Sequence, residues 1–323
     1  MKPAESTLAP AVASAWSPLR NSLFRSLWIA TIVANVGSWM QDVGAGWLMT
    51  SLSPSPSMVA LVEAADSFAI MLLALPAGAI ADIVDRRRLL IAVQVYLLIV
   101  AGALGILTLL DLTGAWALLG FTFALGVGAA MMMPAWSAIV PELVRREELS
   151  AAVALNSVAI NASRAIGPAI AGVLVAAVGP WLVFVLNALS YIGIIVVLVG
   201  WRREHRKSTL PAERFFSALR VGMRFVLHAD ALQVVLIRGA AFFIFASATW
   251  ALFPLVVRRE LARGPEIYGL LLTCIGVGAV AGAMFLPRLR SLTCKTSLCW
   301  PWQCSQPAWP GSRFFPPCRL PRR

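Results

Sequence analysis

The sequence contains few charged residues, few cysteines and almost no histidine. Charged residues make up 13% of the 323 positions, whereas an ordinary soluble domain carries about 25%. Five cysteines, four of them after Arg290, exclude a disulfide-dense secreted scaffold. The two histidines leave little for a histidine-based metal site, and neither an ATP-binding G-x-x-x-x-G-K-[ST] motif nor a zinc-protease H-E-x-x-H motif is present. We therefore predict a protein that is not an enzyme, with no catalytic residues, no metal, no cofactor and no use of ATP. Any process it drives that needs energy would have to use an ion gradient.

Apolar residues are abundant instead, at 59% of the sequence, and they form long runs. A helix that crosses the hydrocarbon core of a membrane needs about 20 mostly apolar residues. The net charge of +12 comes from basic residues that cluster between these runs, which is typical of loops beside membrane spans rather than of nucleic-acid binding. We therefore predict an all-α integral membrane protein in contact with the lipid bilayer. Its eight candidate spans lie near residues 26–50, 57–81, 88–110, 115–139, 151–176, 180–201, 231–257 and 267–287.

The basic residues also predict the orientation of the spans, because basic loops stay on the cytoplasmic side. The N-terminal tail and the second-to-third and fourth-to-fifth connections carry Lys or Arg, whereas the alternate connections SLSPSPS, DLTGA and AVGPW carry neither. We therefore expect a cytoplasmic tail over residues 1–24 and a basic cytoplasmic connecting loop over 202–230. Arg258, Arg259 and Arg263 disagree, since they follow the seventh span on the predicted outer side. The topology is kept because the first helices usually decide orientation.

The connection after the second span carries a motif of defined spacing. It reads Gly78-Ala-Ile-Ala-Asp82-Ile-Val-Asp85-Arg86-Arg87-Arg88. This motif resembles the signature loop of the major facilitator superfamily of transporters, G-x-x-x-D-x-x-G-R-[RK], with Asp85 in place of the usual Gly. Gly78 is expected to permit a close helix approach, and Asp82 is expected to pair with Arg86 four residues on. Together with Arg87, Arg86 would anchor the loop at the anionic leaflet of the membrane.

Further stretches resemble the exporter branch of this superfamily, which includes the enterobactin exporter and macrolide-efflux relatives. In the fifth span, Gly167-Pro168-x-x-Ala171-Gly172 is similar to the end of the fifth-helix motif of proton-coupled antiporters, G-P-x-x-G-G. Pro168 and the small residues around it would bend the helix and admit a close neighbour. The other stretches are Pro134-Ala-Trp-Ser-Ala-Ile-Val-Pro-Glu142-Leu-Val, Ala154-Leu-Asn156-Ser and Leu186-Asn187-Ala-Leu-Ser190, and the resemblance runs from about Ser17 to Arg290.

The resemblance implies the superfamily fold of two six-helix bundles with the substrate site between them. On this basis, residues 25–201 are predicted to form a complete N-terminal six-helix bundle, and residues 231–290 the first two helices of the C-terminal bundle. Residues 291–323 continue no pattern before them, with four Cys, six Pro and three Trp but no acid. Their cysteines lack the closely paired spacing of a zinc site. We interpret this Cys/Pro/Trp-rich tail as the product of a frameshift.

Four charged residues fall inside the predicted spans, where a charge is costly and usually faces a water-filled cavity. They are Asp42, Glu63, Asp66 and Arg164. Because Asp66 and Arg164 are expected at a similar depth in the membrane, we predict them as a proton-coupling pair, with Asp42 as an auxiliary acid. A purely structural ion pair is the alternative, and Glu63 is alternatively an interfacial residue.

Three further residues are predicted to line the substrate path. Asn35 shares a helix face with Asp42, and Asn161 shares one with Arg164, because residues three, four or seven apart lie on the same side of a helix. Trp39 would contact bulky, partly apolar cargo.

Together, the resemblance and the charged residues predict transmembrane transport of a small molecule by alternating access, and the resemblance implies a multi-pass protein of the bacterial inner (plasma) membrane. The expected activity is proton-coupled efflux of a siderophore-like or drug-like substrate, with protons as the second partner. The competing hypothesis, which rests on the aberrant tail, is a truncated, non-transporting membrane fragment without independent activity.

Overall fold

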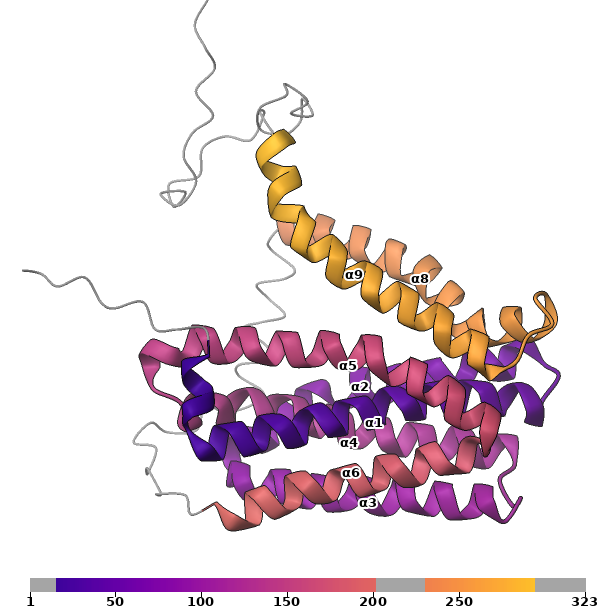
Figure 1. Ribbon diagram of the computed structural model, residues 1–323, viewed down its shortest axis with the longest axis horizontal. Coiled ribbons are helices and arrows are strands. Elements are labelled where there is room, and N and C mark those ends of the chain that lie inside the picture. The colour runs from indigo at the N-terminus through magenta and orange to yellow at the C-terminus, as the bar shows by residue number, and fades with distance from the viewer. Residues whose placement is uncertain (1–15, 202–229, 294–323) are drawn as a thin grey trace, which may run out of the picture. The chain divides into compact units, whose positions relative to one another are not determined.

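A computed structural model describes residues 16–201 and 230–293 of the chain (Figure 1). The predicted connecting loop up to residue 229, the tail from residue 294 and residues 1–15 lie outside the described residues. The chain divides into two compact units, Met1–Gly276 and Val277–Arg323, and the contacts given below are all within the first unit. The long helices of the described ranges are α1 (Ser22–Leu52), α2 (Pro56–Ile83), α3 (Arg86–Leu109), α4 (Ala115–Leu143), α5 (Leu149–Ala177), α6 (Pro180–Gly200), α8 (Asp230–Arg259) and α9 (Pro265–Thr293), and the short 3-10 turns are η1 (Ser17–Arg20) and η2 (Arg146–Glu148).

Each predicted span coincides with one of these long helices, which confirms an all-helical architecture over the described residues. The largest difference is at the end of α9, which reaches Thr293 instead of residue 287. Among the described residues, five helices, α2 to α6, contain segments long and apolar enough to cross a membrane by length and composition. In α9, the apolar segment Pro265–Ala279 is shorter. α1 is less apolar because Ser38, Gln41 and Asp42 interrupt it.

Side-chain caps and prolines set where several helices begin. Asn21 accepts hydrogen bonds from two backbone N–H groups in the first turn of α1. Asp85, which replaces the usual glycine of the signature loop, caps α3 by accepting a hydrogen bond from the Arg88 backbone N–H at 2.9 Å. α2 and α6 begin at Pro56 and Pro180, whose missing N–H costs nothing in a first turn. Short connections join consecutive helices, although most of the close packing is between helices that do not follow each other in sequence.

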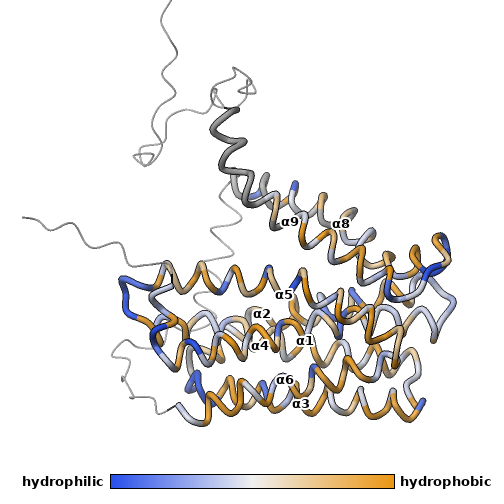
Figure 2. The backbone as a smooth tube through the Cα atoms, in the orientation of Figure 1, coloured by the Kyte–Doolittle hydropathy of each residue, from blue (hydrophilic) through white to orange (hydrophobic). Residues whose placement is uncertain are grey.

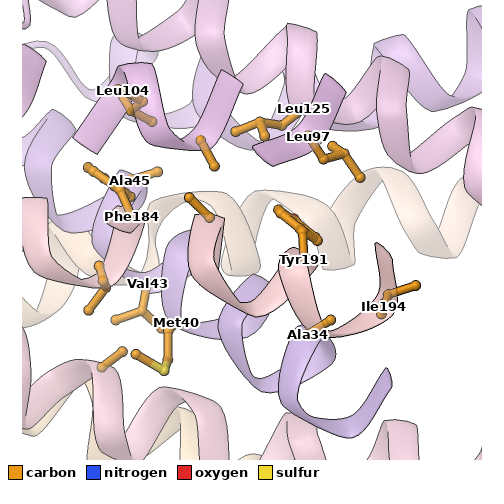
Figure 3. Close-up of a cluster of buried hydrophobic side chains, with 14 of the residues drawn as sticks. Ala34, Met40, Val43, Ala45, Leu97, Leu104, Leu125, Phe184, Tyr191 and Ile194 are labelled. Atoms are coloured by element: carbon orange, nitrogen blue, oxygen red, sulfur yellow. The ribbon is translucent and has the colours of Figure 1, made fainter. Parts of the chain in front are cut away.

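Among the first six helices, α1 is central and contacts α2, α4, α5 and α6. α3 packs against α4 and α6, and α2 packs against α4. Buried side chains of α1, α3, α4 and α6 meet between the helices, among them Leu104, Leu125 and Phe184 (Figure 3). We call the end of the bundle that holds the α2–α3 and α4–α5 connections the Arg86 end, and the end that holds the α1–α2 turn the Pro54 end.

The outward faces of the helices are apolar as well. Ile99, Trp116 and Val196 expose 62%, 75% and 63% of their surface. Figure 2 shows hydrophobic residues along the helices and the most hydrophilic segments at their ends. Soluble proteins rarely expose so much continuous apolar surface, so this surface is suited to contact with lipid.

Candidate functional site

Two cavities lie next to each other against the polar side of α1. The larger, of about 410 Å³, is lined by residues of α1 to α6. The smaller, of about 260 Å³, is lined by residues of α1, α2, α4, α8 and α9. Gln41, Asp42, Asp66 and Leu125 line both of them. These four residues therefore form the wall between the two cavities.

A third cavity, of about 320 Å³, lies between α4 and α5 toward the Arg86 end. It shares Trp136, Ser137, Asn156 and Ile160 with the larger cavity. The smaller cavity lies toward the Pro54 end, because its lining includes Val59 near the start of α2. From the Arg86 end to the Pro54 end, the order is therefore the third cavity, the larger cavity and the smaller cavity. Asp42 and Asp66 lie in the wall between the larger and the smaller cavity.

The predicted acids all lie in these cavities. Asp42 and Asp66 line both the larger and the smaller cavity, and Glu63 lines the smaller one. Asp42 and Glu63 are exposed to the cavity space, and Asp66 is half-buried. No Lys, Arg or His lines any of the three cavities within the described part of the chain. The carboxylates therefore lack a cationic neighbour in the cavity walls described.

Arg164 does not pair with Asp66 in this structure. Its guanidinium lies between two indole rings, 5.3 Å from the centroid of Trp39 and 5.5 Å from that of Trp250. Such cation–π contacts hold a charge without neutralising it. Among the described residues, no ion pair joins Arg164 to an acid. Sequence spacing could not show that Trp250, from α8, occupies the space beside Arg164.

A buried polar network supports the wall between the cavities. The Asn187 amide, which is fully buried, donates to Gln41 Oε1 at 2.5 Å and to the Tyr191 hydroxyl at 3.1 Å. Ser190 in turn donates to the Asn187 backbone carbonyl at 2.6 Å. Because Gln41 precedes Asp42, this network fixes α1 against α6 beside the acid. Sequence reasoning did not assign these residues a role. Asn187 and Tyr191 are polar side chains four residues apart in a mostly apolar span, which places them on one face of the helix.

Gly37 gives this network its space, and enlarging it is expected to destabilise the protein. A Cβ added at Gly37 would lie 2.6 Å from Asn187 Oδ1 and 2.9 Å from Ser190 Oγ. We expect Gly37→Ala to cost about 1–3 kcal/mol by overpacking, measured as a lower melting temperature of the purified protein in detergent. Gly102→Ala is the matched control, because its nearest contact would be Ala188 Cβ at 3.8 Å. Equal melting temperatures for the two variants would contradict the packing argument.

The predicted lining residues are divided between the cavities. Asn35 lines the larger cavity and Trp39 the smaller one. Asn161 lines none of the three, since its amide donates to the Ser157 carbonyl of its own helix at 2.8 Å. Asn156, one turn earlier on α5, lines the larger cavity instead. Helical spacing alone did not distinguish between these two asparagines.

The signature loop joins three helices at the Arg86 end. Arg86 forms an ion pair with Glu142 of α4 at 3.0 Å and donates to the Ala138 carbonyl at 3.1 Å. Arg87 donates to the last carbonyls of α6, at 2.6 Å to Leu198 and 2.8 Å to Val199. These bonds satisfy carbonyls that the end of a helix leaves free.

Two expectations for this loop have different outcomes. The side chain of Asp82 lies outside the described residues, so its expected bond to Arg86 stays a prediction. The close helix approach expected at Gly78 is not present, because no atom of the described residues lies within 4 Å of an added Cβ.

Loss of the Arg86–Glu142 pair is expected to loosen the Arg86 end. We expect Arg86→Gln to destabilise the protein by about 1–2 kcal/mol, because it removes a charged hydrogen bond and leaves Glu142 without this partner. Arg88→Gln is the control, since Arg88 is exposed and bonds through its backbone N–H. Thermal unfolding of both variants measures the difference. A melting temperature of Arg86→Gln no lower than that of Arg88→Gln would show that the pair contributes nothing.

The fifth-helix motif lies where α5 contacts two different helices. A Cβ on Gly167 would be 2.6 Å from Trp39 Cβ and 3.1 Å from the Val36 carbonyl, both on α1. A Cβ on Gly172 would be 2.8 Å from the Pro265 carbonyl and 3.1 Å from Gly269 Cα, both on α9. Between them, Pro168 is buried in the helix. The close neighbour expected at this motif is therefore present on both sides of α5.

A bundle of long apolar helices around polar, acid-lined cavities is the architecture of a multi-spanning membrane transporter. The sequence profile of the transmembrane secretion effector family, a branch of the major facilitator superfamily, matches residues 13–300. The chain belongs to this family. It is therefore a multi-pass membrane protein of a transporter family and not an enzyme, as the sequence predicted.

Known relatives of the chain are distant in sequence. The staphyloferrin A transporter of Staphylococcus aureus is 26% identical over 259 residues, which cover 79% of this chain and 64% of the relative. The enterobactin exporter EntS of Salmonella typhimurium is 25% identical over 277 residues, covering 81% and 62%. The chain thus spans just under two thirds of the length of these relatives.

A solved structure shares the fold. The crystal structure of a bacterial homologue of the human lysosomal transporter Spinster, in an inward-facing and unoccupied conformation, superimposes with a TM-score of 0.61 at 16% identity. The match covers 84% of this chain and 64% of that one. Together with the family match, this similarity shows an all-helical fold like that of the major facilitator superfamily, whereas the assignment of the helices to two bundles stays a prediction.

Proposed function

We propose that the protein exports a small molecule across the bacterial inner membrane in exchange for protons. The observation that carries this proposal is the position of Asp42 and Asp66 in the wall between two cavities that lead toward opposite ends of the bundle. A carboxylate that lines both cavities is able to take up a proton from one side and release it to the other.

The absence of a cation from the described cavity walls supports this role. A carboxylate held by a fixed Arg or Lys stays ionised, whereas one in a low-dielectric cavity without such a partner is protonated more easily. The guanidinium of Arg164 is held between Trp39 and Trp250 instead. In this proposal Asp42 and Asp66 are the coupling residues, and Arg164 is a positioning residue between α1, α5 and α8.

The proposed orientation has the N-terminus and the Arg86 end in the cytoplasm and the Pro54 end outside. It is supported by the basic residues at the Arg86 end, because such residues stay on the cytoplasmic side. In the proposed domain organisation, residues 25–201 form one bundle and residues 231–290 begin a second. Loop 202–230 connects them, and the tail 291–323 takes no part in transport.

The substrate proposed is a siderophore-like or drug-like molecule. The two relatives named above carry staphyloferrin A and enterobactin in their names, which supports a siderophore. The larger cavity supports a bulky, partly apolar molecule, because Met132, Met133 and Trp136 line it. Methionine side chains adapt to irregular shapes, so such a wall suits cargo of variable form.

An efflux assay with the full 323-residue chain tests the proposal. The chain is expressed in a bacterium that lacks its own exporters, and intracellular levels of enterobactin, staphyloferrin A and a panel of lipophilic drugs are measured. We expect lower accumulation of at least one compound, and we expect a protonophore to abolish the difference. Accumulation unchanged for every compound, with the chain present in the membrane, would reject the proposal in favour of a non-transporting membrane protein.

A further inference from the structure

Two arginines that disagree with the charge rule for membrane loops have specific partners in the structure. Arg258 Nη1 donates to Thr50 Oγ1 at 2.8 Å and to Ser51 Oγ at 2.9 Å. Arg259 donates to the backbone carbonyl of Pro54. Both arginines end α8, and all three acceptors belong to the end of α1 or the turn that follows it. The last turn of α8 is therefore tied to the α1–α2 turn at the Pro54 end.

Aromatic rings add to this contact. The Arg258 guanidinium lies 5.6 Å from the centroid of the Trp47 ring. Trp47 stacks on Tyr268 of α9 with the ring centroids 6.2 Å apart. The ring centroid of Phe253, from α8, lies 5.9 Å from that of the same tyrosine. Arg258 thus contacts Trp47, which belongs to a cluster of three aromatic side chains from α1, α8 and α9.

One residue of this cluster lines the smaller cavity. Tyr268 lines that cavity, together with Gly46 from α1 and Pro254 from α8. Gly46 precedes Trp47, and Pro254 lies one turn before Arg258, so the cavity wall and the arginine contacts are adjacent along both helices. At the Pro54 end of the smaller cavity, these contacts hold α1 and α8 together.

We propose that Arg258 and Arg259 form a latch that closes the smaller cavity at the Pro54 end and that must open to connect Asp42, Glu63 and Asp66 with the outer side. The claim that opening connects the acids with the outer side rests on the proposed function. The contacts that form the latch do not depend on it. It also explains why basic residues are tolerated on the outer side, since their guanidinium groups are engaged by hydroxyl, carbonyl and indole groups.

Cysteine labelling tests the latch without any transported compound. The five cysteines of the full chain, Cys274, Cys294, Cys299, Cys304 and Cys318, are replaced by Ser, and Ala251→Cys is introduced as a reporter in the smaller cavity. A membrane-impermeant maleimide is added to right-side-out membrane vesicles. We expect Arg258→Gln to raise the labelling rate about ten-fold, the change in the open population that follows from losing one charged hydrogen bond.

Two further variants separate a latch from a general effect of charge. Arg258→Lys keeps the charge but loses the planar guanidinium with its several fixed hydrogen-bond donors. It is therefore expected to raise labelling less than Arg258→Gln does. Arg263→Gln removes an exposed arginine of the same connection for which no side-chain bond is found among the described residues, and it is expected to change nothing. Labelling in Arg258→Gln equal to that in the parent in both right-side-out and inside-out vesicles, or an equal rise in Arg263→Gln, would overturn the proposal.

A second reporter guards against unfolding. Ala101→Cys, fully buried in α3, must stay unlabelled in every variant, so that labelling at position 251 reports opening and not a loss of structure. Faster labelling of Arg258→Gln together with no export of any compound would leave the latch in place and reject the proposed function. Faster labelling only in inside-out vesicles would retain the latch and reverse the proposed orientation.

Discussion

Replacing Asp42 or Asp66 by asparagine is expected to abolish proton-driven export by the chain. Both carboxylates line the two cavities at once, and in the proposed mechanism each exchanges protons with both sides of the membrane. Asparagine keeps the size and much of the hydrogen bonding but cannot carry a proton. Because a positioned proton-transfer group contributes about 100-fold or more to a reaction rate, we expect efflux to fall by at least that factor.

Glu63→Gln is the matched comparison for these variants. Glu63 lines only the smaller cavity, so we expect it to retain a larger share of the efflux than Asp42→Asn or Asp66→Asn. Efflux is measured in cells with equal amounts of each variant in the membrane. If Asp42→Asn and Asp66→Asn both export at the parent rate, the carboxylates are structural and the coupling mechanism is wrong.

A valine at Gly269 is expected to block transport by separating α9 from α5. A Cβ at this position would lie 2.3 Å from the Pro168 carbonyl and 2.9 Å from Gly172 Cα. Backbone atoms cannot move aside as a flexible side chain does, so the two helices would have to part. Closely packed helices move past one another only when small residues let their backbones approach. We expect efflux by Gly269→Val to drop about ten-fold or more, in line with the about 1–3 kcal/mol that overpacking costs.

Gly120→Val is the control for this prediction. Gly120 is exposed on α4, and a Cβ added there would have no described atom within 4 Å. The variant should therefore export at the parent rate and melt at a similar temperature. Equal efflux by Gly269→Val and Gly120→Val would show that the α5–α9 contact has no part in the transport cycle.

The helices were predictable because their signals are local. About 20 apolar residues in a row, bounded by proline, glycine or charge, specify a membrane helix without reference to the rest of the chain. For the same reason the cavity-lining position of Asp42, Glu63 and Asp66 was predictable, since a charge in such a helix must avoid lipid. The family resemblance was carried by spaced motifs, which are local as well.

The partners of the polar side chains were not predictable, because they depend on which helices meet. Asp66 and Arg164 were expected to pair, but the structure places Arg164 between two tryptophans, one of them on α8. Asn187 is bonded to Gln41, which is distant in sequence, and nothing in either segment indicates the other. Arg258 and Arg259 depart from the charge rule because that rule describes loops in water, whereas these two side chains are bonded to the end of α1 and the turn after it.

Substrate-driven proton movement is the measurement that tests the central claim most directly. The purified chain is reconstituted into liposomes that contain a pH-sensitive dye, and the compound found in the efflux assay is added on one side. The account predicts that a gradient of this compound drives protons in the opposite direction, and that the double variant Asp42→Asn and Asp66→Asn moves neither. Movement of the compound without protons, or unchanged proton flux in the double variant, would contradict it.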